Sequence, residues 1–116
     1  MLLICYKKCS TCKKVEKIFQ DKNIKYEYRN IDIDNPTKEE IKSWHEKTRL
    51  DIKKFFNTSG KIYRENNLKD KLKDMSLDDK YKLLSTDGLL VKRPILIKDD
   101  GEILVGKDVV KFAESK

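Results

Sequence analysis

The hydrophobic and polar positions in the first third of the chain predict a strand, a helix and a second strand. Residues 2–6 form a short apolar run that is typical of a buried strand. Over residues 12–19 the apolar side chains recur at helical spacing, and residues 25–31 alternate as in a strand before a turn at 32–36. Together these elements predict a β-α-β unit whose two strands are parallel.

The middle of the chain, about residues 37–87, has helical periodicity broken by short polar turns. Thr37 and Glu40 have the spacing of a capping box. They predict a helix that buries Ile41 and Trp44. The whole segment therefore reads as a helical insertion between two halves of a small sheet.

The end of this insertion has a second capping pattern. Ser76 and Asp79 predict another helix, with Leu77, Tyr81 and Leu84 on its buried face. We expect Gly88 to end this helix in the left-handed conformation that glycine adopts easily.

The last third returns to strands. Residues 93–97 and 103–105 flank a polar turn with the composition of a hairpin, and residues 108–112 predict a terminal helix. The order strand-helix-strand, helices, strand-strand, helix predicts an α/β thioredoxin-like fold. In this fold a small mixed β-sheet is flanked by helices, and we expect residues 1–116 to form a single domain with a central helical insertion.

The candidate chemistry lies at Cys9 and Cys12, a C-x-x-C pair at the start of the first predicted helix. A helix N-terminus has unpaired backbone N–H groups and a positive dipole end. Four lysines, at positions 7, 8, 13 and 14, add positive field. We therefore expect the pKa of Cys9 to be lowered and this residue to perform thiol–disulfide chemistry.

The composition of the chain indicates the cellular compartment and the partners to expect. The chain has no apolar run long enough to span a membrane and no signal peptide at its start. We therefore expect a cytoplasmic protein in a reducing compartment, where a close cysteine pair is redox-active rather than structural. Net charge is +7, but the lysines are spread over the whole chain, so we expect neither a nucleic-acid partner nor a membrane partner.

A metal site is not expected. A zinc site needs four ligands, whereas the chain has three cysteines and one histidine. Cys5 lies inside the first predicted strand and is expected to be a small buried hydrophobe. His45 lies beside Trp44 on a helix, and we expect it to be a packing or surface residue rather than a catalytic base.

Three sequence blocks resemble the arsenate reductase (ArsC) family, which also includes the Spx and MgsR regulators. The thioredoxin-like fold is also the fold that this resemblance implies, and the short ArsC-like members are the most similar. Because the blocks are spread along the chain, the resemblance covers nearly all of it. They are residues 6–14, residues 54–64, and residues 87–97 together with Val105 and Gly106.

The resemblance implies roles for individual residues. Cys9 matches the family nucleophile, and Arg93 matches the arginine that holds an oxyanion or contacts the thiol pair. Cys12, by contrast, stands where the glutathione-dependent reductases commonly lack a second cysteine. From its position three residues after Cys9, we expect it to be a resolving thiol that discharges Cys9 through an internal disulfide. The expected substrate-binding positions are Ser10, Thr11 (through its backbone N–H), Lys13 and Pro94, the last being the proline that is cis in thioredoxin-like folds.

Two departures from the family pattern bear on substrate. Arsenate reductases of this type supply two further arginines to the oxyanion, and these align with Asn57 and Gly106. Each charge-assisted contact is worth about 1.5–3 kcal/mol, so their loss weakens oxyanion binding. Arsenate reduction is therefore not the activity that we expect.

Two functions remain open. The first is a cytoplasmic thiol–disulfide oxidoreductase that uses the Cys9–Cys12 pair, holds no bound cofactor, and receives electrons from glutathione, glutaredoxin or thioredoxin. The second is an Spx- or MgsR-like redox regulator that binds the C-terminal domain of the RNA polymerase α subunit. The first is favoured because residues 54–60 resemble the short reductase-like members rather than Spx.

Overall fold

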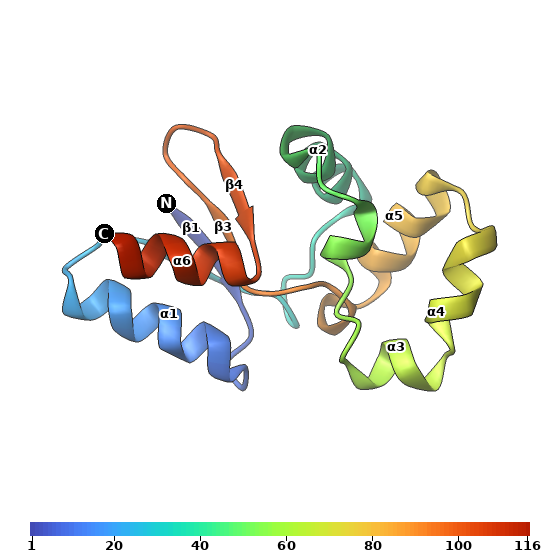
Figure 1. Cartoon of the computed structure of the whole chain (residues 1–116), viewed down its shortest axis with the longest axis horizontal. Helices are drawn as coiled ribbons and strands as arrows, with labels where there is room; N and C mark the ends of the chain where they lie inside the picture. The colour runs from blue at the N-terminus through green and yellow to red at the C-terminus, as the bar shows by residue number, and fades with distance from the viewer.

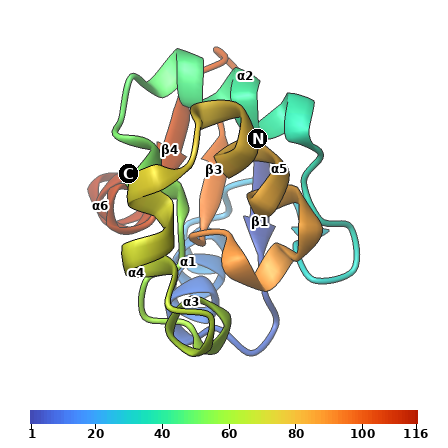
Figure 2. The same cartoon turned by 90° about the vertical axis from the view of Figure 1, so that its right-hand side faces the viewer.

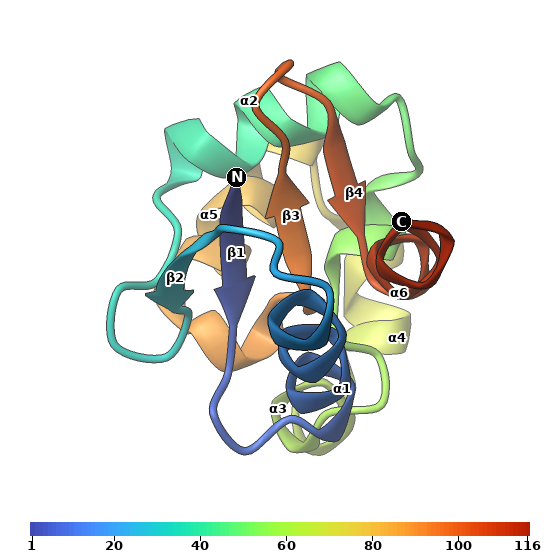
Figure 3. The ribbon, with the colours of Figure 1, turned by 90° about the vertical axis from the view of Figure 1, so that its left-hand side faces the viewer.

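A computed structural model describes all residues 1–116 and confirms the mixed α/β architecture. Four strands form one sheet in the order β2-β1-β3-β4 (Figure 3). β1 is parallel to β2 and antiparallel to β3, and β3 is antiparallel to β4. The strands are β1 (Leu2–Cys5), β2 (Glu27–Asn30), β3 (Ile95–Ile97) and β4 (Ile103–Val105).

Helices cover both faces of this sheet. α1 and α6 contact each other and lie on one face, whereas α2 to α5 lie on the other (Figure 1). Figure 2 shows the second group in front of the strands. The helices are α1 (Ser10–Asp21), α2 (Lys38–Thr48), α3 (Lys61–Glu65), α4 (Leu68–Lys71), α5 (Leu77–Thr86) and α6 (Lys107–Ser115), with 3-10 helices over Ile52–Phe55, Leu72–Asp74 and Gly88–Leu90.

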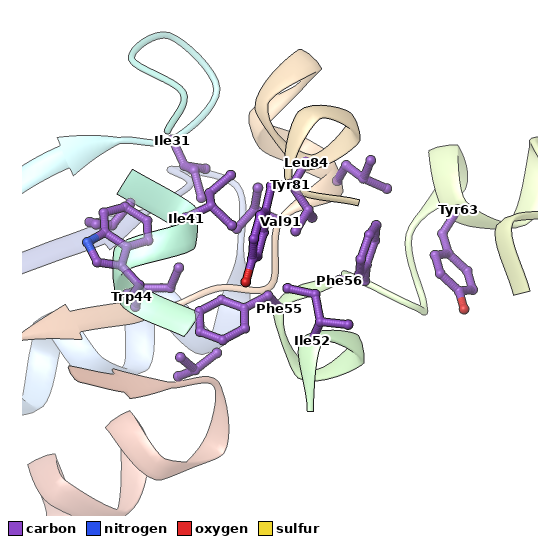
Figure 4. Close-up of a cluster of buried hydrophobic side chains, with 14 of the residues drawn as sticks. Ile31, Ile41, Trp44, Ile52, Phe55, Phe56, Tyr63, Tyr81, Leu84 and Val91 are labelled. Atoms are coloured by element: carbon purple, nitrogen blue, oxygen red, sulfur yellow. The ribbon is translucent and has the colours of Figure 1, made fainter. Parts of the chain in front are cut away.

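Alternation along the strands creates two hydrophobic cores, because successive side chains of a strand point to opposite faces. Leu3 and Cys5 of β1 join a cluster with residues of α1 and α6, including Phe19 and Val109. Ile4 points the other way, into a larger cluster built mainly from the insertion. Figure 4 shows that cluster, with Ile31, Ile41, Trp44, Ile52, Phe55, Phe56, Tyr63, Tyr81, Leu84 and Val91 labelled.

The predicted capping box at the start of the insertion is confirmed. The Thr37 hydroxyl accepts from the Glu40 backbone N–H at 3.1 Å, and the Glu40 carboxylate accepts from the Thr37 N–H at 3.0 Å. The same carboxylate accepts two hydrogen bonds from the Arg29 guanidinium, at 2.7 and 2.9 Å. Glu40 therefore connects strand β2 to helix α2.

The end of the insertion differs from the prediction at two residues. Gly88 does not adopt the left-handed conformation; α5 ends at Thr86, and Gly88 begins a 3-10 helix. Glycine is needed there because a Cβ would lie 1.7 Å from the backbone oxygen of Ile31. Leu77, expected on the buried face of α5, is 46% exposed because it is the first residue of the helix and extends beyond the core.

The return from the insertion to the sheet positions Arg93. Phe56 and Val91 form an isolated antiparallel bridge. The Asn57 N–H donates to the Leu90 carbonyl at 2.8 Å, and the Lys92 N–H donates to the Phe55 carbonyl at 2.7 Å. These bonds fix the backbone immediately before Arg93.

Candidate functional site

Cys9 lies between the end of β1 and the start of α1. Its backbone N–H donates to the Tyr6 carbonyl at 3.0 Å, which closes a turn whose two inner lysines are exposed. Cys9 is the N-cap residue of α1, with an extended backbone (φ −86°, ψ 121°). Its thiol is half-buried, so this sulfur lies at the surface next to the first turn of a helix.

Cys12 lies one turn further along α1 and is fully buried. Its thiol raises the pKa of Cys9 and its backbone N–H lowers it, so both groups lie close to the Cys9 sulfur. Both cysteines are free thiols in this structure. The C-x-x-C pair therefore consists of one accessible sulfur and one inner sulfur, and Cys9 packs against the cluster that contains Cys12.

Arg93 reaches the site from the segment before β3. Its guanidinium interacts with the Cys9 sulfur and lies over the Tyr6 ring, with Cζ 4.9 Å from the ring centroid. Nη1 donates to the Leu89 carbonyl at 3.3 Å. Nε is buried and has no hydrogen-bond partner, so this arginine retains a donor beside the thiol pair.

The expected lowering of the Cys9 pKa is wrong for the protein with its cysteines reduced. The Cys12 thiol and burial raise the pKa of Cys9 and outweigh the lowering by the Cys12 backbone N–H and by Arg93. The Cys5 thiol and then burial raise the pKa of Cys12 to about 12, against the lowering by Cys9 and the Tyr6 backbone N–H. Both thiols therefore remain mainly protonated at neutral pH.

The predicted substrate-binding residues surround the pair unevenly. Ser10 and Lys13 of α1 are exposed, and Thr11 is half-buried. Pro94 is buried, and the Arg93–Pro94 peptide bond is cis. The structure thus places three of these side chains on the first turns of α1 and the fourth next to Arg93.

The two positions that lack the family arginines lie next to the Arg93–Pro94 segment. The Asn57 side-chain amide donates to the Leu89 carbonyl at 3.4 Å, the same oxygen that accepts from Arg93. The Gly106 N–H donates to the Pro94 carbonyl at 2.8 Å. Neither position supplies a cation, whereas the Arg93 guanidinium lowers the pKa of Cys9.

A cavity of about 500 Å³ opens beside this segment. It is lined by Leu50, Asp51, Lys53, Lys54, Phe56, Thr58, Lys92, Val105, Gly106, Lys107 and Asp108. Cys9 is not part of its lining. The cavity therefore adjoins the site through Lys92 and Gly106 and does not contain the thiol pair.

Sequence reasoning missed two features of the site. Tyr6 received no role, although its ring supports the Arg93 guanidinium; its signal is an aromatic residue directly before the C-x-x-C turn. Cys5 is buried as expected, yet its thiol also interacts with Cys12. That contact had no local signal, because it joins a strand to a helix.

Three further findings concern features outside the thiol site. His45 lies within the insertion, and its ring nitrogens are 2.6 Å from the Tyr81 hydroxyl and 2.8 Å from the Leu50 carbonyl. No group of three or more His, Cys, Asp or Glu residues is arranged to hold a metal ion. None of the helices is both long enough and apolar enough to cross a membrane.

Comparison with known proteins agrees with this architecture. The uncharacterized protein YusI of Bacillus subtilis is 46% identical over 95% of this chain and 92% of its own. The global transcriptional regulator Spx 1 of Bacillus cereus is 32% identical over 84% and 72%. A crystal structure of an ArsC-family-related protein from Bacteroides fragilis superimposes with a TM-score of 0.89 at 43% identity, covering 99% of this chain and 96% of that one. The ArsC family model matches residues 5–114, and the chain therefore belongs to the ArsC family.

Proposed function

We propose that this protein is a thiol–disulfide oxidoreductase of the reducing cytoplasm, with Cys9 as nucleophile and Cys12 as resolving thiol. One observation supports this most directly: an accessible sulfur at a helix N-cap lies close enough to an inner thiol and an arginine for both to shift its pKa. Two neighbouring thiols of this kind can form a disulfide by exchange with a substrate disulfide, and this reaction needs no bound cofactor. The function rests on these groups and on membership of a family that contains thiol-dependent reductases.

The proposed cycle has three steps. The Cys9 thiolate attacks one sulfur of a substrate disulfide, forms a mixed disulfide and releases the other substrate sulfur as a thiolate. Cys12 then loses its proton and attacks the Cys9 sulfur, which releases the second substrate thiolate and leaves a Cys9–Cys12 disulfide. A dithiol donor such as glutaredoxin or thioredoxin, or two glutathione molecules, reduces this disulfide and returns the enzyme to its starting state.

Arg93 has a defined task in this cycle. Its interaction with Cys9 lowers the pKa of that thiol, and its free Nε gives a second donor for an incoming anion or leaving thiolate. Ser10, Thr11, Lys13 and Pro94 are the proposed substrate contacts around it. Arsenate is a poor substrate in this proposal, because Asn57 and Gly106 provide no further cations for a multiply charged oxyanion.

The test uses the reduced protein and a small disulfide such as oxidised glutathione. Wild type is expected to end with an intramolecular disulfide, and Cys9→Ser is expected to lose all turnover. Cys12→Ala is expected to stop at a mixed disulfide on Cys9, seen by mass spectrometry. Lys17→Ala, an exposed change on α1, is the matched control and retains full activity. Turnover that survives Cys9→Ser would contradict the proposal.

The similarity to Spx 1 favours a second candidate, a redox regulator that binds the RNA polymerase α subunit. The discriminating experiment is a binding assay with the isolated C-terminal domain of that subunit, using reduced and oxidised protein. Binding that changes with the Cys9–Cys12 disulfide and is insensitive to redox state in Cys9→Ser supports the regulator. Disulfide turnover without such binding supports the enzyme.

A further inference from the structure

The chain has a third thiol beside the pair. Cys5, the last residue of β1, is fully buried and belongs to the same hydrophobic cluster as Cys12, against which Cys9 also packs. The sulfur of Cys12 lies beside the backbone N–H of Tyr6, the residue that follows Cys5. The Cys12 thiol therefore lies close to both the Cys9 and the Cys5 thiols.

The surroundings of Cys5 are unusual for an inert buried cysteine. In the parallel register Leu3 pairs with Tyr28 and Cys5 pairs with Asn30, so these four side chains share the face that α1 covers. The Tyr28 hydroxyl and the Asn30 side-chain oxygen are buried without a hydrogen-bond partner. An unsatisfied buried polar atom costs about 1–3 kcal/mol of stability. The Tyr28 and Asn30 oxygens on the same face as Cys5 therefore suggest a functional role that offsets this cost.

Tyr28 can supply a hydrogen bond to a charged sulfur. Burial raises the pKa of its hydroxyl, and a negative charge on Cys5 raises it further. The phenol therefore stays protonated, and its O–H has no other partner in the protein. A thiolate formed at Cys5 thus has a donor on the same face of the sheet.

We propose that Cys5 is a second resolving thiol, which attacks the Cys12 sulfur of the Cys9–Cys12 disulfide and releases Cys9. This inference rests on the proposed function, which creates the first disulfide. Cys5 loses its proton and its sulfur bonds to the Cys12 sulfur, while the Cys9–Cys12 bond breaks. Cys9 leaves as a thiolate and takes up a proton, so one disulfide replaces another and no oxidant or reductant is consumed.

The exchange moves the disulfide from the surface to the interior. The Cys5–Cys12 bond lies beneath α1, where neither sulfur is accessible. Cys9 is again a free thiol and can attack a second substrate before any donor has acted. The oxidised protein thus has two forms that differ in whether Cys9 reacts with a thiol reagent.

Digestion with trypsin distinguishes the two disulfides, because it places Cys5 on a different peptide from Cys9 and Cys12. Cleavage after Lys7, Lys8 and Lys13 gives one peptide with Cys5 (residues 1–7) and one with Cys9 and Cys12 (residues 9–13). The full-length reduced protein is oxidised with one equivalent of diamide and sampled over time. Each sample is quenched in acidified denaturant containing excess N-ethylmaleimide, and then digested.

Two products are expected to appear one after the other: first the Cys9–Cys12 disulfide, called the loop, and then the Cys5–Cys12 disulfide, called the cross-link. Peptide 9–13 first carries an internal disulfide, and later it is joined to peptide 1–7 with one maleimide on Cys9. A loop that persists while Cys5 always carries maleimide overturns the inference and leaves the proposed function intact. If neither the loop nor the cross-link forms, the result contradicts the proposed function instead.

Three variants sharpen the result. Cys5→Ala is expected to form only the loop, with circular dichroism to confirm folding; if it does not fold, the wild-type time course still decides. Tyr28→Phe is expected to slow the cross-link several-fold without changing loop formation. Cys9→Ser is expected to lose the rapid cross-link; formation at the wild-type rate would overturn the exchange route.

Discussion

The reactivity of Cys9 depends on groups within its immediate reach. The Cys12 thiol raises its pKa most, whereas the Cys12 backbone N–H and the Arg93 guanidinium lower it. A helix N-terminus alone therefore does not determine the ionisation of an N-cap cysteine. The partner thiol reverses the direction expected from the dipole and from the nearby lysines.

This balance predicts the pH dependence of Cys9 alkylation. Because its pKa is raised, the thiolate is the minor form at neutral pH, and its fraction rises about tenfold per pH unit below the pKa. The rate with iodoacetamide should still be rising at pH 9, where an unperturbed thiol with a pKa of about 8.5 begins to level off. A plateau near pH 7 would contradict the raised pKa.

Removal of the Cys12 thiol should make Cys9 more reactive. Cys12→Ala deletes the largest cause of the raised pKa and retains the backbone N–H that lowers it. Alkylation of Cys9 at pH 7 is expected to accelerate by about tenfold or more, since one pKa unit changes the thiolate fraction tenfold. Lys17→Ala, an exposed change on the same helix, is the control and should leave the rate unchanged. An equal or slower rate in Cys12→Ala would mean that the thiol contact does not set the pKa.

Arg93 should act in the opposite direction. Arg93→Met keeps an apolar chain beside Tyr6 but removes the charge that lowers the Cys9 pKa. We expect Cys9 alkylation at pH 7 to slow by about threefold, a change of roughly 0.7 kcal/mol that is typical of a partly exposed charge interaction. Arg64→Met, an exposed arginine on α3, is the control. If Cys9 is alkylated at the same rate in Arg93→Met and Arg64→Met, Arg93 does not influence the reactivity of Cys9.

At the level of elements, local patterns predicted more than long-range contacts did. The β1-α1-β2 unit, the capping box at Thr37 and the β3–β4 hairpin follow from residues that are near each other in the sequence. The role of Gly88 does not, because the atom that excludes a side chain belongs to Ile31. Leu77 matches the helical spacing but extends beyond the core, which is a property of the tertiary structure.

Gly88 predicts a strong effect of a single methyl group. In Gly88→Ala the new Cβ meets the Ile31 backbone oxygen at 1.7 Å, and relief requires movement of backbone. We expect the free energy of unfolding to fall by about 3 kcal/mol or more, as for other severe steric changes. Gly101→Ala, at φ +90° with nothing within 4 Å of its Cβ, should cost only about 1–2 kcal/mol of strain. Urea denaturation of both variants makes the comparison, and a milder loss at Gly88 would contradict the close approach.

The Arg29–Glu40 pair should make stability depend on pH. The Arg29 guanidinium lowers the pKa of Glu40, so the pair stabilises the fold above the unfolded value of about 4.3, and its contribution is lost as pH falls through the lower folded value. Glu40→Gln keeps the capping acceptor and should cost about 1 kcal/mol at pH 7, since Glu40 is partly exposed. The difference from wild type should shrink as pH falls through that lower value and disappear below it. Glu39→Gln, its exposed neighbour, is the control, and a deficit that persists in acid would exclude the ion pair as its cause.

At the scale of the molecule, the sheet separates two hydrophobic cores, and β1, β3 and β4 contribute side chains to both. The insertion is joined to the sheet by the Phe56–Val91 bridge and by the hydrogen bonds around Lys92. Hydrophobic spacing predicted which segments are helices and strands. It did not predict that Arg93 lies beside Cys9, which came from family resemblance, because no local pattern relates residues so distant in the sequence.

These connections predict that the insertion and the sheet unfold as one domain. Trp44, the only tryptophan, reports on the insertion by fluorescence, and alkylation of Cys12 reports on the core beneath α1. Leu84→Ala should lower stability by about 3 kcal/mol through its cavity and shift both denaturation curves by the same amount. Loss of the Trp44 signal while Cys12 stays protected would show two separate units.

The contacts of Arg93 have a mechanical consequence for the site. One carbonyl, that of Leu89, accepts both the 3.3 Å hydrogen bond from this arginine and the 3.4 Å hydrogen bond from Asn57. If the guanidinium swings toward an incoming anion, it breaks a single long bond, worth about 0.5–1.5 kcal/mol, and Asn57 still satisfies the oxygen that it leaves. The Arg93 side chain can therefore move toward a bound anion without a change in the backbone around Leu89.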